Sequence, residues 1–185
     1  VVIGLIVVVV FIVVLLIVMG MYNGLVRRKV DCDNGWAQID VQLKRRYNLI
    51  PNLVETVKGY AGHERETLDS VVKARSQAVS ASGVASQASA EGELSNALGR
   101  LMMIVEQYPD LKANQNFLSL QEELTSTENK IGFSRQFYND SVMTFNTKVQ
   151  TVPTNIIAGM FKFEEEEFFE LQEQAAREAP KVSFS

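Results

Sequence analysis

The feature that most constrains this chain is an apolar run at its N-terminus. Residues 1–22 are apolar apart from Gly4 and Gly20, and none of them is charged. As a helix that rises about 1.5 Å per residue, the run extends about 33 Å, enough to cross a hydrocarbon core of about 30 Å. The run therefore predicts a transmembrane helix. No second uncharged apolar run approaches the roughly 18 residues of another span, which excludes a multispanning transporter.

A basic cluster follows the span and predicts its orientation. Arg27, Arg28 and Lys29 come after the apolar run, and the positive-inside rule places such a cluster on the cytoplasmic side. Tyr22 stands where an interfacial anchor belongs. We therefore expect the following domain in the cytoplasm, with the lipid bilayer as a partner. A cleaved signal peptide is the alternative, and it would need a shorter apolar core preceded by basic residues.

The rest of the chain has the composition of one polar domain. Without the span, the apolar share is about 40%, slightly below the roughly 45–50% of globular proteins. The net charge of −4, without a basic stripe interleaved with aromatic residues, argues against nucleic acid as a partner. Cys32 is the only cysteine and His63 the only histidine, so the chain holds no disulfide, no CxxC pair and no pair of histidine ligands. We expect no cofactor, no metal and no catalytic residue.

The first helix after the span is predicted from Trp36 to Val57, where apolar residues recur every three or four positions. Pro51 falls inside this pattern without shifting its phase. We therefore expect either a kink or a brief break at the proline. The basic run at residues 44–46 is placed mostly on the opposite, polar face.

Two further helices are predicted on either side of a stretch of small residues. One begins near Glu64, and the other ends at Pro109. Between them, residues 80–92 are mostly Ser, Ala and Gly, which favours a flexible connection. The side chains expected to face inward are Leu68, Val71, Val72 and Val79 in the first helix and Leu94, Leu98, Leu101, Val105 and Tyr108 in the second.

The clearest periodic feature is a seven-residue repeat in the second half of the chain. A repeat of this period keeps one seam of a helix facing its partners. The seam consists of Phe117, Leu124, Ile131, Tyr138 and Phe145. A coiled coil has a second apolar position in each repeat, which we call the companion position. Here it is occupied by the small polar residues Thr127, Ser134 and Ser141, which disfavours an extended coiled coil. We predict an all-α fold, with the transmembrane helix followed by an antiparallel bundle of long helices.

Aromatic and acidic side chains crowd the last part of the chain. Phe161, Phe163, Phe168 and Phe169 lie beside the glutamates at 164–167. They form either a last helix packed on the bundle or an exposed surface that joins a second subunit or the bilayer. The four glutamates oppose anionic headgroups and disfavour the bilayer. The predicted organisation is a transmembrane helix (1–22), a basic juxtamembrane segment (23–35), a helical bundle (36–152) and this C-terminal segment (153–185).

The chain contains several long motifs: WAQIDVQLKRR (36–46), LIPNLV (49–54), VKGY (57–60), YPDLKAN (108–114) and TENKI (127–131), with Phe117, Arg135, Tyr138, Asn139 and Pro153. Together these motifs resemble those of the bacterial LemA family. The similarity covers Tyr22 to Phe169, although Gly35 and Asn48 replace the alanine and aspartate common in that family. It implies a single-pass protein of the bacterial cytoplasmic membrane, with a short outer N-terminus and a cytoplasmic helical bundle, and it supplies no catalytic residues.

Three functions stay open on the sequence. We favour a non-enzymatic, membrane-anchored scaffold that forms a homo-oligomer or organises another membrane protein. A metal-dependent hydrolase near the membrane is the rival, because helical bundles hold carboxylate clusters, although the spacing selects no pair. A signalling adaptor would use the hydroxyl side chains at 125–127 as exposed modification sites. The carboxylates of the rival hypothesis are Asp40, Glu55, Glu64, Glu66 and Glu128.

Overall fold

The computed structural model describes residues 1–170, and this part of the chain folds into helices with no strand. The all-α prediction is confirmed. Residues 171–185 of the predicted C-terminal segment lie outside the described part. The helices are α1 (Val2–Tyr60), α2 (Arg65–Ser80), α3 (Val84–Val105), α4 (Pro109–Lys112), α5 (Gln115–Gln150) and α6 (Thr154–Phe161).

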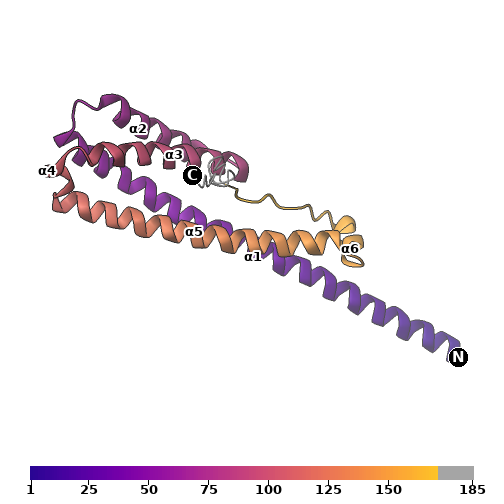
Figure 1. Ribbon diagram of the computed structural model, residues 1–185. Helices are drawn as coiled ribbons and strands as arrows, with labels where there is room; N and C mark the ends of the chain where they lie inside the picture. The colour runs from indigo at the N-terminus through magenta and orange to yellow at the C-terminus, as the bar shows by residue number, and fades with distance from the viewer. Residues whose placement is uncertain (171–185) are drawn as a thin grey trace, which may run out of the picture. The chain divides into compact units, whose positions relative to one another are not determined.

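Contacts divide the chain into two compact units. Among the described residues, the span unit comprises residues 1–40 and 132–168, and the bundle unit comprises residues 41–131 and 169–170. In the bundle unit, α2 and α3 lie side by side, and the short helix α4 leads from α3 into α5 (Figure 1). Short connections between these helices make chain neighbours antiparallel, as expected for a bundle.

Helix α1 begins with the apolar run and continues far beyond it. Its most apolar window has a mean hydropathy of 3.7, and no residue of that window is buried. Within residues 1–170 it is the one helix long and apolar enough to cross a membrane. The helix passes through residues 22 and 35 without a break, so neither predicted segment boundary interrupts the secondary structure.

Pro51 lies inside α1, and the predicted break at this position is absent. Proline has no backbone N–H, so the carbonyl of Tyr47 loses the donor that a helix normally supplies four residues on. The side chain of Arg75, from α2, takes this role and donates from Nε to the Tyr47 carbonyl oxygen at 2.8 Å. A neighbouring helix thus satisfies the acceptor that proline leaves open.

The predicted flexible connection at residues 80–92 is wrong for most of its length. Only residues 81–83 lie between α2 and α3, with Gly83 at a φ of 85° that disfavours a residue with a Cβ. Residues 84–92 form the first turns of α3 because alanine, glutamine and glutamate favour helix. Gln87, Ala88 and Glu91 are buried there.

Several predicted burial assignments need correction. Val72 and Val79 are exposed, and α2 instead buries Ala74 and Ala78 beside Leu68 and Val71. The buried residues follow one another at intervals of three or four, which places them on one face of the helix, and Val72 and Val79 lie off that face. Tyr108 is half-exposed, and α3 ends at Val105, ahead of Pro109.

The seven-residue seam of α5 is buried along its whole length. Its first three members, Phe117, Leu124 and Ile131, lie in the bundle unit, and Tyr138 and Phe145 lie in the span unit. The companion hydroxyls of Thr127 and Ser141 are buried and donate to the helix carbonyls four residues earlier. These hydrogen bonds explain how a polar companion position is accommodated inside the fold.

Candidate functional site

The core of the bundle unit contains a buried ion pair. Arg46 of α1 is 4% exposed, and Glu91 of α3 is 2% exposed. The Arg46 Nη1 atom donates to Glu91 Oε2 at 3.0 Å. Arg46 was predicted on the polar face, and the structure corrects this. The burial follows the helix phase, because Arg46 takes the place of an apolar residue in a buried stripe of α1 that runs Ile39, Leu43, Arg46, Ile50, Leu53 and Val57.

Two further side chains complete the hydrogen bonding of Glu91. The hydroxyl of Tyr47 donates to Glu91 Oε1, and Gln87 Nε2 lies 3.2 Å from the same oxygen. Gln87 Nε2 also donates to the Tyr47 hydroxyl oxygen at 2.8 Å and to the carbonyl of Ala78 at 3.1 Å. Each oxygen of the carboxylate therefore has a hydrogen-bond partner, and these partners come from α1 and α3. A buried charge requires such compensation.

Arg46 also connects the ion pair to a groove open to solvent. Its Nη2 atom donates to Ser95 Oγ at 2.9 Å and lies 3.2 Å from Glu128 Oε2 on α5. The Glu128 side chain is half-exposed. It lines a groove of about 390 Å³ whose walls are Arg46, Ser95, Leu98, Gly99, Met102, Leu124, Thr125, Glu128 and Asn129.

The electrostatics of this cluster suit structural support. Burial raises the pKa of Glu91, and the hydrogen bond from Tyr47 and the charge of Arg46 oppose that shift. Burial and the adjacent Glu91 raise the pKa of Tyr47 well above its usual range, so the phenol stays protonated and acts as a donor. The ion pair links α1 and α3, and the contact of Arg46 with Glu128 adds α5. A shift of one helix would separate the buried charges, which is costly, so the pair fixes the relative position of the three helices.

The span unit is held by aromatic contacts near the end of the apolar run. The ring centroid of Tyr22 lies 4.7 Å from that of Phe161 and 5.8 Å from that of Phe163. Phe163 also contacts Phe145 of α5, at 6.3 Å between centroids. These distances are within the range of favourable aromatic pairs. They fix the C-terminal end of α6 at the level of Tyr22.

After α6, the chain runs along α5 as an extended segment, residues 163–168, which we call the strap. Asn146 holds it at two points: its Nδ2 donates to the Glu166 carbonyl, and its Oδ1 accepts from the Glu166 N–H, both at 2.9 Å. The Tyr138 hydroxyl donates to the Glu167 carbonyl at 2.8 Å. The strap therefore obtains from side chains the backbone partners that a strand would obtain from a sheet.

The predicted topology residues take three different roles. Lys29 forms ion pairs with Glu166 of the strap at 2.6 Å and with Asp33 at 3.0 Å. Burial lowers its pKa, but the hydrogen bonds with Glu166 and Asp33 outweigh this and leave the pKa raised. Arg28 pairs with Asp31 at 3.4 Å. Arg27 and Arg28 line a groove of about 520 Å³ together with Gly24, Val26, Val30, Asp31 and Lys148.

The four phenylalanines predicted as an assembly surface differ in exposure, so the prediction needs correction at the buried ones. Phe169, in the bundle unit, is 1% exposed and is unavailable to a partner. Phe163 is half-buried in the span unit between Tyr22 and Phe145. Phe161 and Phe168 remain partly exposed. Only part of the predicted surface is therefore open.

Three of the five carboxylates of the hydrolase hypothesis contact other side chains. Glu128 pairs with Arg46, Glu55 pairs with Lys58, and Glu64 accepts from the Tyr108 hydroxyl at 3.3 Å. No three His, Cys, Asp or Glu side chains come together as metal ligands among residues 1–170. For the adaptor hypothesis, Thr127 is buried and Thr125 is exposed.

The LemA family model matches residues 35–184, a region that contains the buried ion pair, the seam and the strap. The chain belongs to the LemA family. The resemblance inferred from the motifs is therefore confirmed. The match begins at Gly35, after the apolar run, and continues through the C-terminal segment.

Curated relatives agree with this assignment. Magnetosome protein MamQ 2 of Paramagnetospirillum magneticum is 28% identical over 88% of this chain and 68% of its own length. Magnetosome protein MamQ of Magnetospirillum gryphiswaldense is 27% identical over the same shares. Protein LemA of Metamycoplasma hominis is 29% identical over 76% of this chain and 64% of its own length. None of these three is named as an enzyme. The LemA membership and the apolar helix identify a membrane-associated helical protein.

Proposed function

We propose that the chain is a non-enzymatic scaffold, anchored in the membrane by the first part of α1, that self-associates or organises another membrane protein. The observation that carries the proposal is the continuity of α1. One helix of 59 residues contains both the exposed apolar run and a buried stripe of the bundle. A partner bound to the bundle is thereby attached to the membrane through regular helix rather than through a loop.

Exposed aromatic side chains support the association step. Phe133 on α5 is 74% exposed, and Phe137, one turn later, is also exposed. Large apolar side chains close together on a surface favour a contact with another protein. We assign Phe133, Phe137 and Phe168 to this contact. The cytoplasmic face of the bacterial inner membrane is the proposed location, from the basic cluster at 27–29.

The test is the mass of the intact protein extracted in mild detergent. Native mass spectrometry should show a homo-oligomer or a bound membrane protein. Phe133→Ser and Phe168→Ser should each reduce that assembly and leave the helix content unchanged. Met103→Ser, at an exposed position of α3 in the bundle unit, is the matched control. A strict monomer without any bound protein, before and after substitution, would contradict the scaffold.

A further inference from the structure

Helix α6 exposes an apolar face that no described residue covers. Ile156 and Met160 lie one turn apart on α6, and Val152 lies in the turn that precedes the helix; all three are exposed, Met160 to 70%. Phe161 extends this face. The opposite side of the helix, with Ile157 and Ala158, is buried. Residues 149–161 contain no charged side chain, and a lysine flanks them at each end, Lys148 and Lys162.

The apolar face lies at the end of the transmembrane run. The contact of Phe161 with Tyr22 puts the C-terminal end of α6 beside the last residue of that run. Both belong to the span unit, and the run extends beyond α6 on its own (Figure 1). An apolar face next to an exposed span meets the same surroundings as the span, namely lipid.

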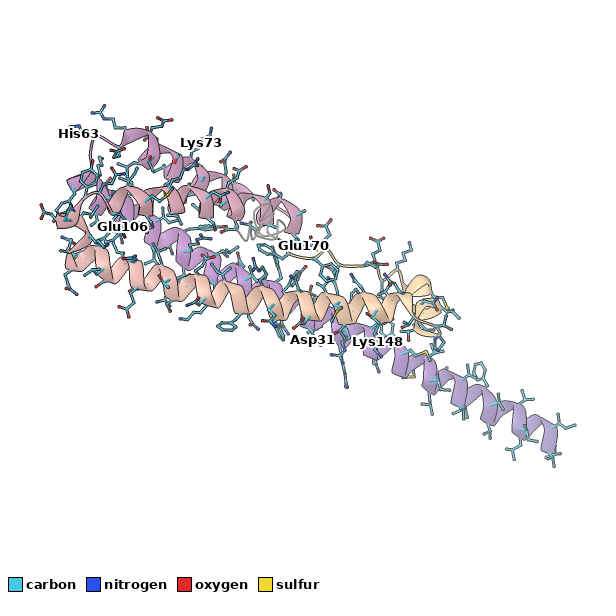
Figure 2. The ribbon with its side chains drawn as sticks, viewed as in Figure 1. Asp31, His63, Lys73, Glu106, Lys148 and Glu170 are labelled. Atoms are coloured by element: carbon cyan, nitrogen blue, oxygen red, sulfur yellow. The ribbon has the colours of Figure 1, made fainter. Side chains whose placement is uncertain are left out.

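A basic groove lies further along α1, beyond the end of the apolar run. Arg27 and Arg28 follow Tyr22 at about 8–9 Å along the helix, by the helical rise of about 1.5 Å per residue. Lys148 joins them from α5, and Val26 and Val30 supply apolar walls. Figure 2 shows Lys148 and Asp31 side by side at this end of α5. Asp31 pairs with Arg28, and neither Arg27 nor Lys148 has an ion pair within residues 1–170.

Among the described residues, one of the four glutamates at 164–167 has a cationic partner, and Glu164 and Glu165 are exposed. Glu166 is neutralised by Lys29, which follows Tyr22 by about 10 Å along α1. The strap then continues to Tyr138, whose ring lies against Trp36 at 5.6 Å, about 20 Å beyond Tyr22. Screening at physiological salt acts over about 8 Å, so the later acidic residues have little effect at the level of α6.

We infer that α6 lies in the bilayer interface, with Val152, Ile156, Met160 and Phe161 among the acyl chains, and that the groove of Arg27, Arg28 and Lys148 binds the phosphate of an anionic phospholipid. This goes beyond the scaffold function and rests only on the membrane anchoring. The occupant of the apolar face is lipid because the face continues the exposed surface of the span. The three cations then act on the headgroup whose chains cover α6.

The first test measures the surroundings of α6 in nanodiscs of phosphatidylglycerol and phosphatidylcholine. In a Cys32→Ala background, which removes the native thiol, a spin label at Met160→Cys should be accessible to oxygen and protected from a water-soluble nickel relaxant. The control label at Asp140→Cys, on an exposed position of α5 in the same unit, should show the reverse. Equal nickel accessibility at both sites would overturn the inference. Protection of the Met160→Cys label from both relaxants, with dipolar broadening between copies, would assign the face to a second copy and also overturn it.

The second test measures headgroup binding by the full chain in detergent. Native mass spectrometry should show retention of phosphatidylglycerol over phosphatidylcholine, and Lys148→Gln should weaken that retention about fivefold, the effect of one juxtamembrane cation. Lys73→Gln removes the same charge from α2 of the bundle unit and should have no effect (Figure 2). Equal retention in the two variants would overturn the groove assignment. So would displacement of the lipid by inorganic phosphate at the same concentration, which would identify a site for free anions. Neither outcome bears on the oligomeric state that tests the scaffold.

Discussion

The bundle unit and the span unit hold their helices together by different means. The bundle unit places a charged pair, Arg46 and Glu91, in its core and surrounds it with hydrogen-bonding side chains. The span unit uses aromatic rings and a strap held through its backbone by Asn146 and Tyr138. The first arrangement depends on mutual charge and is sensitive to the loss of one partner. The second distributes its stability over several weaker contacts and leaves an apolar face open.

The largest expected effect is on the bundle unit. Arg46→Met leaves the Glu91 carboxylate buried without its cation, which should destabilise this unit by about 3–5 kcal/mol. Hydrogen exchange of the detergent-extracted chain should show lost protection in α3, while amides near Tyr138 in the span unit stay protected. The double variant Arg46→Met with Glu91→Met is the control and should recover most of the stability, since apolar replacement of a whole buried pair is often tolerated. A double variant as unstable as the single one would show that the pair is not an independent feature.

A comparable break of the span unit is expected at Gly35, where α1 and α5 approach closely. A Cβ added at Gly35 would lie 3.0 Å from the Tyr138 Cα and 3.3 Å from the Phe137 Cδ1. Gly35→Val should therefore destabilise the span unit by about 1–3 kcal/mol, seen as faster exchange of amides in residues 134–146. Gly132→Val is the matched control, because nothing lies within 4 Å of its added Cβ. Equal effects of both valines would mean that helix propensity, not the close approach, determines the result.

The strap provides a smaller effect within the same unit. Asn146→Ala removes both hydrogen bonds to the backbone of Glu166 and should release the strap at a cost of about 1–2 kcal/mol. The Glu166 amide should then exchange about tenfold faster, which corresponds to about 1.4 kcal/mol. Thr147→Ala, which removes a hydroxyl bonded only to the Met143 carbonyl of its own helix, should leave this amide unchanged. An unchanged Glu166 amide in Asn146→Ala would show that Tyr138 and Lys29 are sufficient to hold the strap.

The smallest effect concerns the thiol of Cys32, which is buried in the span unit. Burial raises its pKa to about 11, from about 8.5 in an unfolded chain. Alkylation by iodoacetamide at pH 8 should therefore be at least about a hundredfold slower than in urea, because the thiolate is the reactive form. The thiol of the unfolded chain loses its proton at a lower pH than the thiol of the folded chain. The free energy of unfolding should therefore fall as the pH rises from about 8.5 to about 11. Fast alkylation of the folded protein would place Cys32 at the surface instead.

The sequence was informative wherever an apolar period extends over many residues. The seam from Phe117 to Phe145 is buried at every position, and the run at 1–22 forms exposed helix, as hydrophobic spacing predicts. The strap has no period at all, and its partners Asn146 and Tyr138 are separated from it along the chain. Such contacts follow from the tertiary fold and have no local signal.

The burial of Arg46 and Glu91 was predictable from their positions in the helical repeat, although their charge argued against it. Arg46 lies three residues after Leu43 and four before Ile50, so its phase is that of the core. Glu91 likewise stands three residues before Leu94 on the buried face of α3. Both residues are buried, as their helical phase predicts, although each is charged. Their burial is tolerated because the opposite charges compensate one another. The small residues around Glu91 suggested flexibility, although alanine is the strongest helix former.

Pro51 has a consequence for how α2 is aligned along α1. The carbonyl that it leaves free at Tyr47 is matched by the guanidinium of Arg75. A slip of α2 by one turn would move Arg75 about 5.4 Å and leave the carbonyl without a donor, at a cost of about 1–3 kcal/mol. Apolar contacts alone tolerate such slips more readily, because one turn brings similar side chains into similar places. Proline usually ends a helix, but Pro51 lies within α1 and selects a single alignment of α2 along it.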